Sequence, residues 1–435
     1  MENAVPLSGI PQAPTRARYG VVGFAVTLAV ITYIDRVCIA KAAPHVMRDL
    51  RLDDWQWSWV LTSFSLAYGL FEIPWGWLGD KIGARKVLMR IVVCWSFFTM
   101  ATGWAWGFWS LVATRALFGM GEAGAFPNLT KTFTTWLPFH ERVRAQGILW
   151  LSARWGGAFT PLLVTAVMLF VSWRSAFAIF GAIGIVWAFF FYRWYRDEPR
   201  DHPSVNDAER ALLPTDAGRA GHVPTPWGLF LRSPRVWLLW TQYFFLAYAA
   251  MFYITWLPPW MDRTYPELSP GFRSLLTASP LFFAGIGSLF CGFFLSRLTA
   301  WVGNPDRARR WMASTGFLGS SLATVAFIHI QDPVWKMAAL GVAGFSNDLV
   351  MPSSWGACMD LGRKYAGTLS GSMNMMGCAG AALFPIAAER LKAWTGGNWD
   401  AVFYVSAGVY FLGIFCWLFL DSVTPLEKGR EEATA

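Results

Sequence analysis

The stretch that decides the fold is YGVVGFAVTLAVITYIDRVCIAK, residues 19–41, in which Tyr33-Ile34-Asp35-Arg36 interrupts an otherwise apolar run. The run is long enough to cross a bilayer as a helix of about 20 residues. A charge near the middle of such a helix costs about 2.5–3.5 kcal/mol on insertion scales, so charges there usually serve a function. The acid and the base therefore predict a transmembrane helix that faces a polar pathway.

The composition agrees with a protein that crosses the membrane many times. Hydrophobic residues make up 55% of the 435 positions and charged residues only 14%, which is unlike a soluble enzyme. The net charge of +9 forms no basic stripe among exposed aromatics, so nucleic acid is not an expected partner. The cysteines and histidines lack metal-ligand spacing, and no nucleophile–base pair stands out. We therefore expect no enzyme activity, no catalytic residue, no metal and no cofactor.

The apolar segments predict twelve spans. They lie at 18–41, 56–78, 87–106, 109–131, 145–170, 175–195, 236–260, 274–296, 311–330, 334–356, 366–392 and 400–420. Most of the 36 Lys and Arg residues fall on the cytoplasmic side if both termini are inside, as the positive-inside tendency requires. A long polar stretch separates six spans from six. We expect an all-α membrane protein with twelve transmembrane helices in two six-helix bundles, residues 1–195 and 234–435, joined by a cytoplasmic linker, 196–233.

The loop after the second span carries the first motif, Gly76-Trp-Leu-Gly-Asp80-Lys-Ile-Gly83-Ala-Arg85-Lys. It resembles the signature cytoplasmic loop of the major facilitator superfamily. Gly76 permits a close helix approach and Gly83 a tight turn. Asp80 is suited to pair with a base or to cap the N-terminus of a neighbouring helix. We expect Gly76, Asp80, Gly83 and Arg85 to act as a conformational gate; the simpler interpretation is an ordinary basic loop.

Further motifs resemble the anion:cation symporter family of that superfamily, which includes proton-coupled bacterial carriers of galactonate, hexuronates and glucarate. They are Tyr33-Ile-Asp35-Arg36, Arg115-x6-Glu122, Trp136-Leu-Pro138 before Glu141-Arg142, and Lys364-Tyr-Ala-Gly-Thr-x-Ser-Gly-x-Met-Asn374. The resemblance implies that Arg36 binds a substrate carboxylate, that Asp35 and Glu122 take up protons, and that Arg115 supports the coupling. It also implies that Tyr68, Trp355 and Asn374 hold the substrate.

Helical spacing makes these roles physically reasonable. Tyr33 and Arg36 are three residues apart and share a face, whereas Asp35 points about 100° away from Arg36. Arg115 and Glu122 are seven apart, nearly in line but separated by about 10 Å along the axis. We expect these two to face one cavity without pairing. The alternative is a purely structural salt-bridge network between the first and fourth spans.

Arg154, in the fifth span, departs from the family pattern, which has an uncharged polar residue in this region. It is a candidate substrate-binding residue that would hold a second carboxylate or a hydroxyl-rich tail. Equally, it would balance Glu72 or Asp348, both of which lie within apolar spans. The sequence leaves these two interpretations open.

Together these features predict a monomeric, proton-coupled symporter of the cell inner membrane. It would import a small organic anion, a hexuronate or an aldonate, by rocking of its two halves within the lipid bilayer. A carrier of aromatic acids or dicarboxylates is one alternative. An anion exchanger of the same fold is the other.

Overall fold

The computed structural model describes residues 13–213 and 225–427, so linker residues 214–224 and both chain ends lie outside the description. All regular elements of the described residues are helical. The first half consists of α1 (Ala17–Leu50), α2 (Asp54–Ile82), α3 (Ala84–Gly103), α4 (Phe108–Glu122), α5 (Ala125–Trp136), α6 (Phe139–Met168) and α7 (Trp173–Trp194).

Short helices follow in the linker region: η1 (Pro199–Asp201), α8 (Asp207–Leu212) and α9 (Trp227–Arg232). The second half begins with α10 (Pro234–Met251), the π-helical turn η2 (Phe252–Trp256) and α11 (Leu257–Thr264). It continues with α12 (Pro270–Val302), α13 (Pro305–His329), α14 (Pro333–Gly362), η3 (Arg363–Tyr365), α15 (Ala366–Trp394) and α16 (Trp399–Phe419).

The predicted spans coincide with these helices. The fourth span is formed by α4 and α5 together, and the seventh by α10, η2 and α11. Seven helical stretches of the described residues are long and apolar enough to cross a membrane on composition alone: Ala17–Leu50, Ala84–Gly103, Trp173–Trp194, Pro234–Ile254, Pro270–Val302, Pro305–His329 and Trp399–Phe419. The other spans, formed by α2, by α4 with α5, and by α6, α14 and α15, do not meet this criterion, and each of them contributes residues to the cavity between the two halves.

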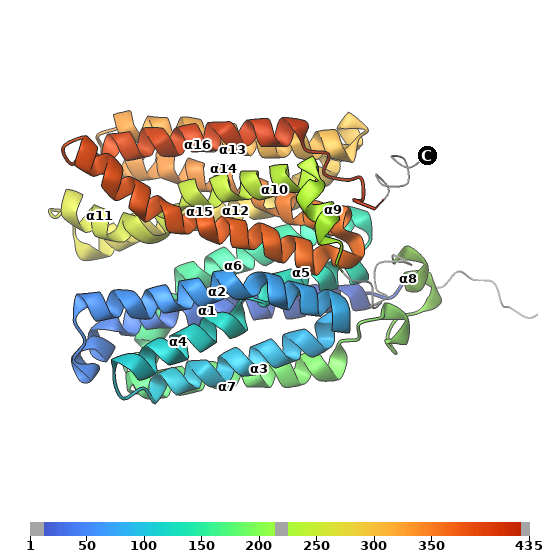
Figure 1. Ribbon diagram of the computed structural model, residues 1–435, viewed down its shortest axis with the longest axis horizontal. Helices are drawn as coiled ribbons and strands as arrows, with labels where there is room; N and C mark the ends of the chain where they lie inside the picture. The colour runs from blue at the N-terminus through green and yellow to red at the C-terminus, as the bar shows by residue number, and fades with distance from the viewer. Residues whose placement is uncertain (1–12, 214–224, 428–435) are drawn as a thin grey trace, which may run out of the picture.

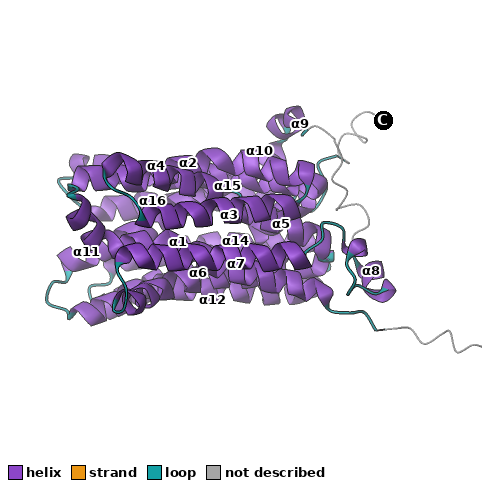
Figure 2. Ribbon diagram, turned by 90° about the horizontal axis from the view of Figure 1, so that it is seen from below, coloured by secondary structure: helices purple, strands orange, loops and turns teal. Residues whose placement is uncertain are grey.

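The helices run side by side along the long axis of the molecule. Helices α1–α7 lie together below and α10–α16 above in Figure 1. Figure 2, turned by 90°, shows the same long helices running along the same axis. The two groups meet where α2 packs on α15 and α6 packs on α12. This arrangement agrees with the predicted all-helical fold of two groups of helices. The exact bundle boundaries at residues 195 and 234 stay a prediction.

Glycines allow the two groups to approach closely. A side chain at Gly76 of α2 would clash with the backbone of Gly367 of α15, and one at Gly147 of α6 with the backbone of Ser288 of α12. Small residues bring helix backbones together in membranes, where packing replaces the hydrophobic effect as the force between helices. Gly76 thus has the close contact that the sequence predicted for it.

Candidate functional site

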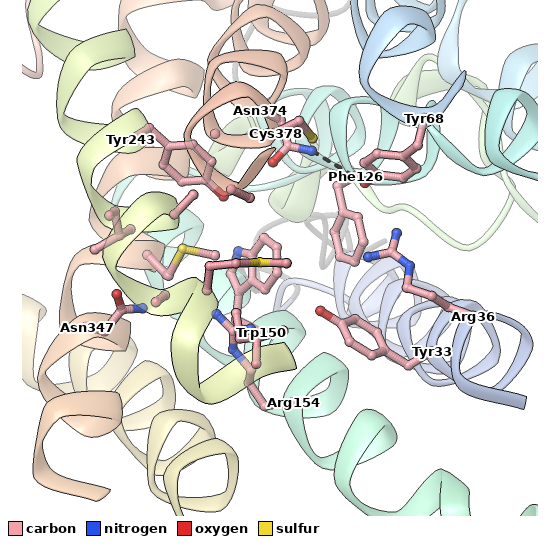
Figure 3. Close-up of a pocket in the computed structure, with 18 residues that line it drawn as sticks. Tyr33, Arg36, Tyr68, Phe126, Trp150, Arg154, Tyr243, Asn347, Asn374 and Cys378 are labelled. Carbon is pink, nitrogen blue, oxygen red and sulfur yellow. Dashed lines mark hydrogen bonds between the residues drawn. The ribbon is translucent and has the colours of Figure 1, made fainter. Parts of the chain in front are cut away.

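A cavity of about 180 Å³ lies between the two groups of helices. It is bounded by α1, α2, α5 and α6 on one side and by α10, η2, α14 and α15 on the other (Figure 3). The lining residues that carry polar groups or large rings are Tyr33, Arg36, Tyr68, Phe126, Trp150, Arg154, Tyr243, Asn347, Asn374 and Cys378.

Helix α1 divides its polar residues between two faces. Tyr33 and Arg36 line the cavity, with the Tyr33 hydroxyl pointing toward Arg154 (Figure 3). Asp35 is fully buried on the other face, where one carboxylate oxygen accepts a 3.2 Å hydrogen bond from Trp95 Nε1 of α3. The residue spacing on a helix produces this division. The base therefore faces the cavity and the acid faces a neighbouring helix.

The guanidinium of Arg36 is held by Glu122, the last residue of α4. Arg36 Nη2 lies 2.6 Å from Glu122 Oε1, and Arg36 Nε donates to the same oxygen at 2.9 Å. Glu122 is fully buried, and its other oxygen has no hydrogen-bond partner among the described residues. Within the described part of the chain, the hydrogen bonds to this carboxylate come from Arg36, the cation that also faces the cavity.

Arg115 lies deeper in the same half. It is 1% exposed, and its guanidinium packs 4.2 Å from the ring centroid of Phe118 and 5.3 Å from that of Phe64. Its Nε and Nη1 have no hydrogen-bond partner among the described residues. Neither Arg115 nor Glu122 lines the cavity directly, which corrects the expectation that both face it. The reason is that aromatic rings cover Arg115, whereas Arg36 stands between Glu122 and the cavity.

Arg154 of α6 satisfies both interpretations that the sequence left open. It lines the cavity, and its Nε and Nη2 donate to the two oxygens of Asp348 of α14 at 2.9 and 3.0 Å. Ser288 and Asn347 also donate to Asp348, at 2.9 Å each. The balancing acid is Asp348 and not Glu72, because α6 packs on α14 at this level.

Tyr68 and Asn374 join the halves at the cavity wall. Asn374 Nδ2 of α15 donates to the Tyr68 hydroxyl of α2 at 3.4 Å and also to the Glu72 carboxylate. Both residues line the cavity, where the resemblance placed them.

Trp355 does not line the cavity, contrary to the expectation that it contacts the substrate. It is fully buried, packs behind Trp150 with ring centroids 5.5 Å apart, and donates a 3.0 Å hydrogen bond to the Tyr243 hydroxyl. Tyr243, and not Trp355, lines the cavity. Sequence reasoning missed Tyr243 because an aromatic residue in an apolar span carries no signal of its direction.

Asp80 joins the two halves beyond the cavity, at the end of the molecule where α2 ends and α15 begins. Its carboxylate accepts hydrogen bonds from the Gly367 and Thr368 amides at 3.0 and 2.6 Å and from the Thr368 hydroxyl at 2.6 Å. Lys131 Nζ lies 3.7 Å away. Asp80 therefore caps the N-terminus of α15 and faces a base as well, which are the two possibilities weighed for it.

Gly83 and Arg85 shape the turn that follows. Gly83 has a φ of +92°, a conformation that residues with a Cβ rarely adopt. The Arg85 amide donates to Asp197 at 2.9 Å, and its guanidinium donates to the Tyr192 carbonyl at 2.6 Å. Arg85 thus anchors this loop to the end of α7, within its own half.

A second contact between the halves near the same end of the molecule escaped sequence reasoning. Arg142 of α6 lies 2.6 Å from one oxygen of Asp360 of α14, and Arg309 of α13 lies 2.5 Å from the other. Among the described residues, all hydrogen bonds between the two halves lie at the level of the cavity or nearer the end that holds Asp80 and Asp360. The two halves are therefore joined at this end of the molecule.

A helical membrane fold with a charged cavity between two halves is that of a transporter. Residues 25–385 match the family model described as Major Facilitator Superfamily. The chain belongs to this superfamily, which consists of transporters and not enzymes.

Known relatives of the chain indicate which kind of transporter it resembles. The chain is 32% identical to a probable sulfoacetate transporter of Cupriavidus necator over 426 residues, covering 96% of this chain and 97% of that protein. It is 28% identical to a D-galactonate transporter of Escherichia coli O6:H1 over 423 residues, covering 94% and 96%. The protein is therefore a multi-pass membrane transporter of anions, related to members of the anion:cation symporter family.

Solved structures agree on the fold. The fucose:proton symporter of E. coli superimposes with a TM-score of 0.71 over 93% of this chain and 100% of that chain. The two sequences are 11% identical, so this likeness supports the fold alone.

Proposed function

We propose that this protein imports a small organic anion together with protons across the cell inner membrane, with both termini in the cytoplasm. The anion is a sugar acid, an aldonate or a hexuronate. Residues 1–195 and 234–435 rock against each other around the cavity, as in other transporters built from two halves.

The pairing of Arg36 with Glu122 carries this proposal. A guanidinium holds a carboxylate through a planar fork of donors, so Arg36 can bind the carboxylate of Glu122 or that of a substrate. A proton on Glu122 removes the competing charge and releases Arg36 toward the cavity. Binding of the anion and uptake of the proton then favour each other. Asp35, another buried acid of this half, has one indole donor and is proposed as a further proton carrier, with Arg115 supporting the coupling.

The size and lining of the cavity support a sugar acid. At about 180 Å³ it is smaller than the roughly 300–1,000 Å³ typical of sites for drug-sized ligands. Tyr33, Tyr68 and Asn374 offer hydroxyl and amide groups to the hydroxyls of a polyol chain. The likeness to the D-galactonate transporter points to the same class.

A second candidate substrate is a small dianion such as sulfoacetate. Arg154 lines the cavity beside Tyr33, so a second anionic group would meet a second guanidinium. Arg154 is already neutralised by Asp348, however, so it offers less net charge than an unpaired cation would. The likeness to the probable sulfoacetate transporter supports testing this class beside the sugar acids.

Uptake into proteoliposomes tests the proposal. Radiolabelled D-galactonate, D-glucuronate and sulfoacetate are offered to liposomes with an alkaline interior, with empty liposomes as the control. We expect accumulation of a sugar acid that a protonophore abolishes. Accumulation of sulfoacetate alone would select the dianion class. Exchange of internal for external anion without any response to the pH gradient would identify an exchanger.

A further inference from the structure

Glu72 of α2 is a buried carboxyl to which none of the roles above is assigned. It is fully buried, and Asn374 Nδ2 of α15 donates to its Oε1. Its Oε2 has no hydrogen-bond partner among the described residues, and no Lys or Arg of that part of the chain forms an ion pair with it. The hydrogen-bond donors to this carboxyl are therefore neutral groups, the Asn374 amide and the Tyr68 hydroxyl.

Two other buried carboxyls of the cavity region, Glu122 and Asp348, form ion pairs with arginines. Glu122 pairs with Arg36. Asp348 accepts a hydrogen bond from Arg154 on each of its two carboxylate oxygens, and one more each from Ser288 and Asn347. An ionised carboxylate buried without such partners costs several kcal/mol, whereas a protonated carboxylic acid is neutral and costs far less. The geometry around Glu72 suits the protonated form.

The surrounding groups do not supply the missing cation. The charged and titratable side chains that face Glu72 are Arg36 of α1, Tyr68 of α2, Glu122 of α4, Tyr243 of α10 and Cys378 of α15. Arg36 is the one cation among them and already pairs with Glu122. A second acid nearby further disfavours a negative charge on Glu72.

Glu72 lies on the part of α2 that touches α15. Gly371 of α15 packs against the Glu72 backbone carbonyl, and Gly76 packs against Gly367 one turn further along. Asp80 then caps α15 at the cytoplasmic end. Toward the other side, the partner Asn374 lines the cavity. Glu72 thus lies between the cavity and the cytoplasmic contact of the halves.

We propose that Glu72 is a further proton-binding site of transport, a role that rests on the proposed proton symport. Glu72 Oε2 takes a proton from cavity water and keeps it while α2 and α15 are packed together. When the halves separate on the cytoplasmic side, the contact with Asn374 breaks and cytoplasmic water reaches the carboxyl. The O–H bond then breaks, the proton passes to that water, and the carboxylate is solvated. Each cycle carries one proton on Glu72 in addition to those on other acids.

Infrared difference spectroscopy of the purified protein between acid and alkaline pH tests the proton site without any substrate. Glu72→Gln keeps the acceptor oxygen for Asn374 but cannot titrate. We expect the wild type to show a band of a protonated buried carboxylic acid that Glu72→Gln lacks. Glu389→Gln, which changes an exposed acid at the other end of α15, is the matched control and should keep the band. Identical bands in the wild type and Glu72→Gln would overturn the proposal.

Proteoliposomes then test the transport role, with D-galactonate and sulfoacetate as probes and a pH dye reporting proton entry. We expect Glu72→Gln to move one proton fewer per anion while it still exchanges internal for external anion. An unchanged ratio, or loss of exchange together with coupling, would overturn the role. If Glu72→Gln does not fold, Glu72→Asp decides: a shifted pH profile of uptake supports the role, and an unchanged profile overturns it. Absence of proton entry in the wild type would instead refute the proposed symport, whereas the infrared result would still stand.

Discussion

Replacing Glu122 with Gln should make anion binding independent of pH. In the wild type, the ionised Glu122 competes with the substrate for Arg36, whose Nη2 lies 2.6 Å from the Glu122 carboxylate. Above the pH at which Glu122 loses its proton, affinity should therefore fall by about tenfold per pH unit. Gln carries no charge and leaves Arg36 available at every pH. The variant should keep the affinity that the wild type reaches in acid.

The geometry sets the size of this effect. Two unit charges about 4 Å apart attract by about 4 kcal/mol at an effective dielectric constant of 20. This attraction can change the affinity for the anion by at most about a thousandfold, since each 1.4 kcal/mol corresponds to about tenfold. The substrate carboxylate replaces only part of that attraction, and water screens the cavity side of Arg36. We expect Glu122→Gln to bind D-galactonate about tenfold to hundredfold more tightly than the wild type at alkaline pH.

Equilibrium binding of radiolabelled D-galactonate to detergent-solubilised protein over a pH series is the assay. Glu389→Gln, which changes an acid whose side chain is 57% exposed, should retain the wild-type pH dependence. Glu122→Gln should also keep counterflow exchange, which needs no net proton movement, and lose accumulation driven by a pH gradient. A variant with the wild-type pH slope would refute the competition between Glu122 and substrate, and would direct attention to Asp35.

Three further outcomes are expected. Arg36→Lys should fold but lose about 1.5–3 kcal/mol of anion binding, because an ammonium cannot reproduce the planar fork; unchanged affinity in the same assay would contradict this. Asp80→Asn removes the charge that caps α15 and should shift the protein toward a cytoplasm-open state by about 1–2 kcal/mol. Distances between spin labels on the cytoplasmic ends of α2 and α15 report that shift, and an unaltered distribution would count against it. Burial alone would raise the pKa of Glu141, but the hydrogen bonds and charge of Arg18 outweigh burial and lower it. The resulting stabilisation is complete above the ordinary pKa of the carboxyl and is lost as the pH falls through the lowered value. Arg18→Ala should therefore lower the unfolding temperature more at neutral than at acid pH, and an equal loss at both would refute the linkage.

The sequence by itself determined the class of protein. Apolar runs of bilayer length, basic cytoplasmic loops and one polar linker predict twelve helices in two halves, because the membrane requires each span to satisfy its own backbone. Local periodicity also placed Tyr33 and Arg36 on one face of α1 and Asp35 on another, since side-chain direction within a helix follows from spacing alone.

Only the tertiary structure decided which residues meet across helices. Arg154 pairs with an acid 194 positions later in the chain, and Arg36 with Glu122, 86 positions away. Trp355 and Tyr243 are both aromatic residues in apolar spans, yet one supports the cavity wall and the other forms it. Such choices depend on how helices rotate and pack against distant neighbours, and periodicity within one helix carries no information about its partner.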